Sequence, residues 1–223
     1  MHKIKRELFK IICYLALAAA ILVNGSGAIF LQRPLTADNV FSSLGTVTLL
    51  AYGLWLIWDH FLWKCELCQK YFGVTDISGR WCGTYRRDNS DGESDCQDHG
   101  YALEIKQTFS SVSCSTYQDN GTASAATIAD ITKLPDEDTG IIFCWEGRRA
   151  PVEMCEALKE ENPVFHGTTI LSFSPKTSTG AASLSGDYYT DGGTKGIVRV
   201  QYKGKTLLRR YEPEETPCTE STN

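Results

Sequence analysis

Hydrophobic and polar residues are distributed very unevenly along the chain. Residues 11–32 contain no charged side chain, and a second uncharged run covers residues 40–58. Each run is close to the roughly 20 apolar residues that a helix needs to cross a bilayer. The short segment between the runs contains Pro34, a residue that breaks helices. This pattern predicts a transmembrane hairpin of two helices within residues 1–70.

The residues that flank the two runs predict how the hairpin is oriented. Basic side chains concentrate within residues 3–10, before the first run, and Lys64 and Lys70 follow the second. Positive residues favour the cytoplasmic side of a membrane, so both chain termini are predicted to be cytoplasmic. The aromatic residues within 55–63 are typical of a membrane interface. Two alternatives stay open: a cleaved signal peptide over the first run, or a helical hairpin buried in a soluble protein.

From Gly73 onward the pattern changes to short strand-like runs separated by turn residues. The sequences Asp119-Asn120-Gly121 and Asp191-Gly192-Gly193 are hairpin signals. The predicted strands cover residues 79–87, 101–109, 111–118, 124–134, 140–146, 165–173, 181–190 and 194–203. A closed barrel has no exposed edges, which favours a barrel over a sandwich. We therefore predict an approximately eight-stranded antiparallel β-barrel over residues 73–206, able to hold one small ligand.

Two segments do not follow the strand pattern. Residues 151–161 have helical spacing of apolar positions and are predicted to form a helix between the fifth and sixth strands. Residues 207–223 are acidic and poor in apolar side chains, and they are predicted to be a disordered tail.

Charge and cysteine content narrow the function. The net charge of −5 argues against binding of duplex DNA driven by bulk charge. The nine cysteines are odd in number and irregularly spaced, which indicates reduced thiols rather than a disulfide framework. Cys65 and Cys68 form a lone Cys-x-x-Cys pair, and a zinc or redox site would need further partners. No metal site is predicted.

The sequence also lacks the motifs of common catalytic centres. It contains no nucleophile elbow, no His-Glu-x-x-His and no phosphate loop. With only four histidines, it has few groups for acid–base chemistry. Aromatic residues instead alternate with polar ones in the strands, and arginines stand at strand ends. Aromatic rings stack on bases and arginines neutralise phosphates, so we expect a binding module and no enzyme.

Several short motifs carry a resemblance to a known family. They are Gly79-Arg80-Trp81-Cys82-Gly83-Thr84-Tyr85, Leu103-x-Ile105-x-Gln107, His166-Gly167-Thr168, and Leu184-x-Gly186-x-Tyr188-Tyr189-Thr190 followed by Gly196. In this order, behind a two-helix hairpin, they make the chain resemble the bacterial anti-phage effectors of CBASS. These effectors join two transmembrane helices to a β-strand-rich sensor of cyclic nucleotides. The family carries an Asn after two aromatics in its fifth strand, where this chain has Gly147 after Phe143 and Trp145.

The resemblance implies a function for each part of the chain. A nucleotide cyclase would make a cyclic dinucleotide during phage infection, and the barrel would bind it. The transmembrane helices would then oligomerise, disrupt the inner membrane and kill the cell. The partners implied are the cyclic dinucleotide, the lipid bilayer and further copies of the chain, without duplex nucleic acid and without a cofactor.

The matched motifs and their neighbours supply the candidate ligand residues. Those expected to stack on bases are Trp81, Tyr85, Tyr188 and Tyr189. Those expected to neutralise phosphates are Arg86, Arg87, Lys195 and Arg199. Gln107 and Thr190 are expected to read base edges or ribose. Two other functions stay open, a membrane-anchored lipocalin-like carrier or sensor of a small apolar ligand and an exported envelope protein, and the first of these requires an apolar-lined cavity.

Overall fold

The computed structural model describes residues 37–88, 97–134, 139–148, 164–178 and 180–213, together with the single positions 10, 11, 14 and 18. These residues belong to two compact units. Unit 1 comprises Met1–Asp76 and Thr108–Ser110, and unit 2 comprises Ile77–Gln107 and Ser111–Asn223. The predicted helix over residues 151–161 lies outside the described residues.

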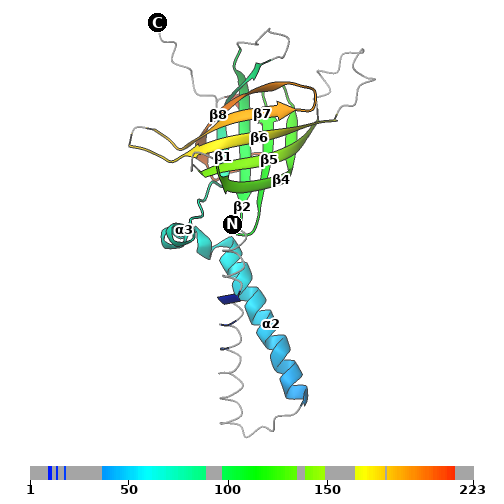
Figure 1. Cartoon of the computed structure of the whole chain (residues 1–223), viewed down its shortest axis with the longest axis vertical. Helices are drawn as coiled ribbons and strands as arrows, with labels where there is room; N and C mark the ends of the chain where they lie inside the picture. The colour runs from blue at the N-terminus through cyan, green and yellow to red at the C-terminus, as the bar shows by residue number, and fades with distance from the viewer. Residues whose placement is uncertain are drawn as a thin grey trace. The chain divides into compact units, whose positions relative to one another are not determined.

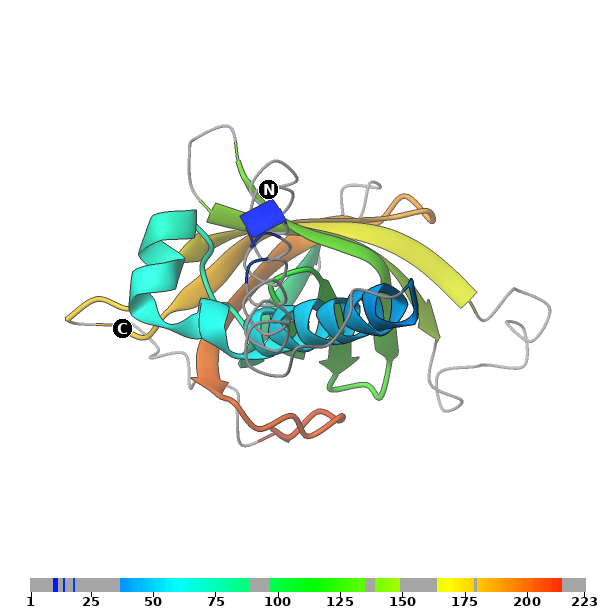
Figure 2. The same cartoon turned by 90° about the horizontal axis from the view of Figure 1, so that it is seen from below.

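In its described residues, unit 1 contains two α-helices joined by a short 3-10 turn. They are α2 (Ala37–His60), η1 (Leu62–Lys64) and α3 (Glu66–Phe72). Figure 2 shows α2 (blue) and α3 (turquoise) as separate coiled ribbons with the turn between them. Helix α2 encloses the second uncharged run, so the prediction of a helix there is confirmed. Most of the first run lies outside the described residues.

Helix α2 leaves large apolar side chains uncovered in its described second half. Leu49 is 72% exposed, Tyr52 is 60% exposed and Ile57 is 49% exposed. Across the described parts of the chain, no helix has both the length and the continuous apolar character needed to span a bilayer. The transmembrane hairpin therefore stays a prediction.

A small aromatic core holds unit 1 together. Trp63, Val74 and Phe109 are buried, and Trp55, Trp58 and Phe72 pack against them. The Asp59 carbonyl accepts a hydrogen bond from the Phe109 N–H at 3.0 Å, and its carboxylate accepts one from the Ser110 N–H at 2.7 Å. The burial of Trp63 corrects the expectation that this aromatic side chain faces a membrane interface, because it makes a protein core instead.

Unit 2 is the predicted eight-stranded antiparallel barrel (Figure 1). Its strands are β1 (Gly79–Asp88), β2 (His99–Gln107), β3 (Val112–Gln118), β4 (Ala123–Lys133), β5 (Thr139–Arg148), β6 (Val164–Ser174), β7 (Ser183–Thr190) and β8 (Lys195–Gly204). Each strand pairs with the next one in sequence, and β8 pairs with β1 to close the barrel. The closure leaves no edge strand unpaired, as the sequence pattern predicts.

Both predicted hairpin turns form as expected. The β3–β4 turn places Gly121 at φ 83°, and the β7–β8 turn places Gly193 at φ 77°. Glycine adopts these left-handed conformations without the steric cost that a Cβ atom adds. Each turn is closed by a hydrogen bond between the flanking strands, from the Gln118 N–H to the Thr122 carbonyl and from the Thr190 N–H to the Thr194 carbonyl.

The barrel is solid at one end. Its interior there is filled by large side chains that are almost fully buried, among them Trp81, Leu103, Ile105, Phe143, Leu171 and Leu184. They come from alternate positions of neighbouring strands, as the two-residue period of a strand requires. This packed half-barrel accounts for most of the core of unit 2.

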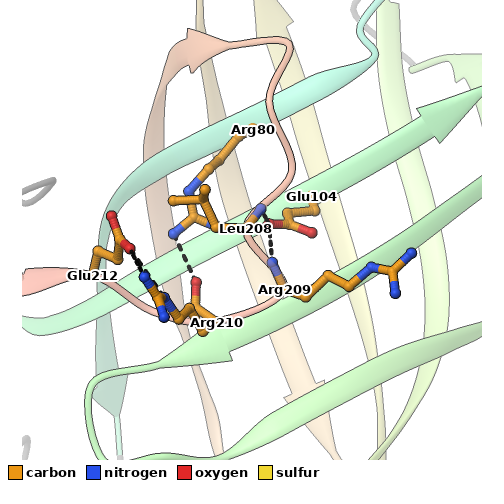
Figure 3. Close-up of polar contacts among 6 residues, drawn as sticks. All are labelled: Arg80, Glu104, Leu208, Arg209, Arg210 and Glu212. Carbon is orange, nitrogen blue, oxygen red and sulfur yellow. Dashed lines mark hydrogen bonds and ion pairs between the residues drawn. The ribbon is translucent and has the colours of Figure 1, made fainter.

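The C-terminal strap, residues 205–213, lies on the outer face of β1 and β2 (Figure 3). Glu104 Oε1 accepts hydrogen bonds from Arg80 Nη1 at 2.7 Å and from the backbone N–H groups of Leu208 and Arg209 at 2.7 and 2.9 Å. Arg80 Nη2 in turn donates to the Arg210 carbonyl at 2.7 Å. The strap covers the ion pair, so Arg80 and Glu104 are only 2% and 3% exposed.

This arrangement corrects the prediction of a disordered tail from residue 207. Residues 208–210 are ordered because an outward-facing ion pair of the barrel binds their backbone. The aromatic ring of Tyr211 also packs on Gly100, where any larger residue would collide with it. The rest of the predicted tail, from residue 214, lies outside the described residues.

Candidate functional site

A cavity of about 490 Å3 occupies the other end of the barrel. It opens where β1, β3 and β7 end, since Arg87, Gln118 and Thr190 line it together with residues of the β3–β4 and β7–β8 turns. Ligand pockets in proteins typically measure about 300–1,000 Å3, so the cavity matches a molecule of drug or nucleotide size. The barrel thus combines a packed end with a hollow one.

Aromatic rings form the deep wall of the cavity. Tyr85 of β1 meets Tyr101 and Tyr188 edge-on, with ring centroids 5.9 and 6.1 Å apart. On the opposite wall the Trp145 ring meets Phe165 edge-on at 5.4 Å. These rings offer flat apolar surface to a planar ligand group, a surface on which any nucleobase can stack.

Polar side chains alternate with the rings and hold one another in place. The Tyr85 hydroxyl donates to Gln118 Oε1 at 3.1 Å. The Trp145 Nε1–H donates to Thr169 Oγ1 at 2.9 Å, and the hydroxyls of Thr116 and Ser124 bond across β3 and β4. A hydroxyl both donates and accepts, so the hydroxyl groups among them keep capacity for a bound polar molecule. The lining is therefore polar and aromatic, unlike that of a carrier for apolar ligands.

Burial raises the pKa of the cavity tyrosines. Burial in the barrel raises the pKa of Tyr85 to about 12, with the Arg87 guanidinium acting in the opposite direction. Burial also raises the pKa of Tyr101 well above its ordinary value. Both rings are neutral at physiological pH and present hydroxyl groups, not phenolates, to a ligand.

Two charged residues stand at the mouth. Arg87 is the single cation among the described lining residues, and Asp191 is the single carboxylate. Asp191 Oδ2 lies 3.3 Å from His166 Nδ1 and accepts a hydrogen bond from the His166 N–H at 3.2 Å. Although desolvation opposes the effect, these contacts with His166 lower the pKa of the Asp191 carboxyl. The mouth therefore combines the guanidinium of Arg87, which interacts with Tyr85, with a carboxylate that His166 already engages.

Four of the predicted site residues come together in this cavity. Tyr85, Arg87, Tyr188 and Thr190 all line it. Tyr85 and Tyr188 supply ring surface, and Arg87 supplies charge. Thr190 has a second role, because its hydroxyl exchanges hydrogen bonds with the backbone of Thr194 and stabilises the β7–β8 turn.

A second group of predicted residues faces the outside of the barrel. Arg86, Tyr189 and Lys195 line an outer groove of about 430 Å3, which Arg87 also borders. Lys195 pairs with Asp88 at 3.3 Å, and Arg86 pairs with Asp98 at 2.9 Å. Arg199 lies on the same outer surface, beside Arg86 and Thr84. Neighbouring strand residues face opposite sides, so Tyr188 and Tyr189 do not share a site.

Two predicted residues, Trp81 and Gln107, belong to neither the cavity nor the outer groove. Trp81 is 1% exposed within the packed end, and its Nε1–H donates to the Ile77 carbonyl at 3.0 Å. Gln107 is buried, and its Oε1 accepts a hydrogen bond from the Ile77 N–H at 2.9 Å. Both side chains hold the entry of the chain into the barrel, which corrects their assignment to a ligand site.

Gly147 has a packing role in the cavity wall. A side chain at this position would collide with the ring of Phe165, the nearest atom of which lies 2.7 Å from the ideal Cβ site. Phe165 thus occupies the space that an Asn in the fifth strand would need. The motif glycines Gly167 and Gly196 likewise leave room for the rings of Trp145 and Tyr188. These glycines are explained by the seating of aromatic rings in the barrel.

The sequence pattern missed most of the residues that line the cavity. The lining residues it did not select include Tyr101, Thr116, Gln118, Trp145, Phe165 and Thr169. Each strand residue among them is an inward position near the end of the barrel that carries the β3–β4 and β7–β8 turns. Knowledge of the register would have identified them, because the inward positions of neighbouring strands at one height form a ring.

Neither a metal-binding cluster among the described residues nor a matching known protein indicates the function of this site. In the parts of the chain that the structure describes, no three His, Cys, Asp or Glu side chains gather as a metal site. No protein-family model matches the sequence, and no curated protein matches it either.

Proposed function

We propose that this chain is a membrane-anchored sensor whose barrel binds a cyclic dinucleotide in the cavity at its open end. The observation that carries the proposal is the cavity itself. It has nucleotide size, aromatic walls, a polar lining and one guanidinium at the mouth. Stacking rings beside an arginine are the groups that recognise bases and phosphates.

The polarity of the lining argues for this ligand class over an apolar one. An apolar molecule would leave the hydroxyls and amides of Thr116, Gln118 and Thr169 without water and without new partners, which costs free energy for each group. A nucleotide brings its own donors and acceptors to these groups. We therefore do not favour the lipocalin-like carrier.

The charge of the lining gives the proposal a specific signature. Arg87 is opposed by Asp191, so the described lining as a whole carries no net charge. Affinity for a cyclic dinucleotide would then rest on stacking and hydrogen bonds more than on bulk attraction. We expect the affinity to fall only a few-fold between 50 and 200 mM salt, on the order of one screened ion pair.

Binding is tested with the full chain in detergent micelles. Titration calorimetry against a panel of purine and pyrimidine cyclic dinucleotides, with a long-chain fatty acid as the apolar comparison, identifies the ligand class. We expect saturable binding of at least one cyclic dinucleotide and none of the fatty acid. Binding of the fatty acid alone, or of no member of the panel, would refute the proposal.

Matched variants locate the site. Arg87→Ala removes the cation that lines the cavity, and Lys195→Ala removes a cation that lines only the outer groove. We expect the first change to weaken binding about tenfold or more, the value of one charge-assisted hydrogen bond of roughly 1.5–3 kcal/mol. The second should leave binding unchanged. Equal losses in both variants would place the ligand outside the barrel.

The membrane part of the proposal rests on the two uncharged runs and on the exposed apolar side chains of α2. The full chain is reconstituted into dye-loaded vesicles of phosphatidylethanolamine and phosphatidylglycerol. We expect the ligand identified by calorimetry to release the dye from vesicles that carry the unchanged protein and not from those that carry Arg87→Ala. Recovery of the chain in the soluble fraction, separate from the vesicles, would exclude membrane anchoring. The binding result from calorimetry would still stand.

A further inference from the structure

Cys65 and Cys68 are the two cysteines of unit 1 that the structure describes, and they lie side by side. Cys65 directly precedes α3, and Cys68 is in its first turn. Cys65 is the N-cap of α3 and Cys68 its third residue, positions whose side chains are neighbours at the start of a helix. Cys65 is exposed and Cys68 is half-buried, so both sulfurs are within reach of small molecules in solution.

The other described cysteines differ in burial or in their neighbours. Cys82 and Cys114 are buried in the barrel, with 1% and 2% of their surfaces exposed. Cys144 is exposed, but its Sγ lies beside Thr168 Oγ1 at 3.6 Å rather than beside a second thiol. Within the described residues, Cys65 and Cys68 are thus the pair able to form a disulfide without a change in the barrel.

The surroundings of the pair favour two-thiol chemistry over metal binding. A structural zinc ion takes four ligands. No group of three His, Cys, Asp or Glu side chains suited to a metal is found in the described part of the chain. Two adjacent thiols without further ligands are the arrangement from which an intramolecular disulfide forms.

The two thiols are not equivalent. The hydrogen bond from Cys68 lowers the pKa of Cys65, and the same interaction raises the pKa of Cys68. A thiolate is the species that attacks a disulfide bond, and the thiol that remains protonated for longer is suited to the second step. The lowered pKa and the greater exposure of Cys65 suit it to the attack, and the raised pKa of Cys68 suits it to the resolving step.

We propose that Cys65 and Cys68 are a reversible redox modification site, oxidised to an intramolecular disulfide by small-molecule disulfides of the glutathione class. The Cys65 thiolate attacks one sulfur of oxidised glutathione and releases one glutathione thiolate. Cys68, after losing its proton to solvent, attacks the Cys65 sulfur of the mixed disulfide and releases the second glutathione. The dithiol loses two electrons and two protons, and oxidised glutathione becomes two molecules of reduced glutathione.

The test uses the reduced full chain in detergent micelles. The protein is incubated with oxidised glutathione, free thiols are blocked with a maleimide, and the chain is digested with trypsin. Cleavage after Lys64 and Lys70 isolates both cysteines in the single peptide 65–70. We expect this peptide to lose two hydrogens, to carry no maleimide, and to regain both labels after treatment with dithiothreitol.

Three variants assign the roles. Cys68→Ser should stop the reaction at one glutathione on Cys65, and Cys65→Ser should slow the modification of Cys68 at least several-fold. Cys144→Ser, which removes an exposed thiol elsewhere, should leave the oxidation of peptide 65–70 unchanged. The proposal is overturned if peptide 65–70 stays fully labelled while Cys144 becomes glutathionylated. It is also overturned if the reduced chain holds a zinc ion that protects both thiols.

Discussion

Replacement of Glu104 by Leu probes the contact that fixes the C-terminal strap to the barrel. One carboxylate oxygen of Glu104 accepts hydrogen bonds from Arg80, Leu208 and Arg209 (Figure 3). In the variant, the Arg80 guanidinium keeps its bond to the Arg210 carbonyl but loses the carboxylate of Glu104. The side chain of Arg80 is 2% exposed, so water does not replace that partner unless the strap lifts.

The size of the effect follows from this burial. Removal of one member of a buried ion pair costs about 3–5 kcal/mol, because the other charge stays desolvated. For a unit of about 150 residues, 1 kcal/mol shifts the melting temperature by roughly 2–4 °C, so we expect a decrease of roughly 10 °C. The free energy of unfolding is measured by urea titration of the full chain, with tryptophan fluorescence as the signal.

Two controls separate burial from the mere loss of an ion pair. Glu212→Leu breaks the pair with Arg210, whose side chains are 34% and 72% exposed, and should cost less than about 1 kcal/mol. The double variant Arg80→Leu with Glu104→Leu removes both charges and should recover much of the loss. A loss in Glu104→Leu as small as that in Glu212→Leu would refute the reasoning, since it would mean that the pair is open to water.

Three further outcomes are expected for unit 2. Gly147→Asn should displace the Phe165 ring and lower the free energy of unfolding by about 1–3 kcal/mol. Gly204→Ala is the control, because a Cβ atom there has no neighbour within 4 Å, and it should leave the free energy of unfolding unchanged in the same urea titration. Trp145→Phe removes the donor to Thr169 and should cost about 1–2 kcal/mol, so an unchanged unfolding midpoint would show that this bond is not formed. Because burial raises the pKa of Tyr85 to about 12 from 10.0, its neutral form stabilises the fold fully below pH 10, and we expect roughly 3 kcal/mol to be lost as the pH rises towards 12. Phenolate absorbance near pH 10 that is present in the unchanged chain and absent from Tyr85→Phe would contradict this.

The strands could be predicted from the sequence because two independent signals agreed on them. Apolar and polar residues alternate along each run, and turn residues such as Gly121 and Gly193 mark the ends. The barrel followed from the number of strands and the need to avoid exposed edges. The C-terminal strap has no such signal in the sequence. Its contacts with Glu104 are made by the backbone N–H groups of Leu208 and Arg209, and the identity of these side chains does not indicate such bonds.

The structure brings only some of the predicted ligand residues to the cavity. Trp81 and Tyr85 lie on the same inward face of β1, yet one belongs to the packed end and the other to the cavity. The two-residue period identifies the face and carries no information on height along the barrel. Height depends on the register with β2 and β8, which only the pairing of whole strands establishes.

The division of the barrel into a packed end and a hollow end lets stability and recognition vary independently. On β1, Trp81 fills the core, and Tyr85 and Arg87 face the cavity four and six residues later. A substitution at Tyr85 or Arg87 changes what the cavity accepts without opening a hole in the core, whereas a substitution at Trp81 destabilises the fold. Homologues of this chain can therefore diverge in ligand choice at a few rim positions while their cores stay fixed. The same separation makes the barrel a scaffold in which a new specificity is engineered at one end at little expense to the fold.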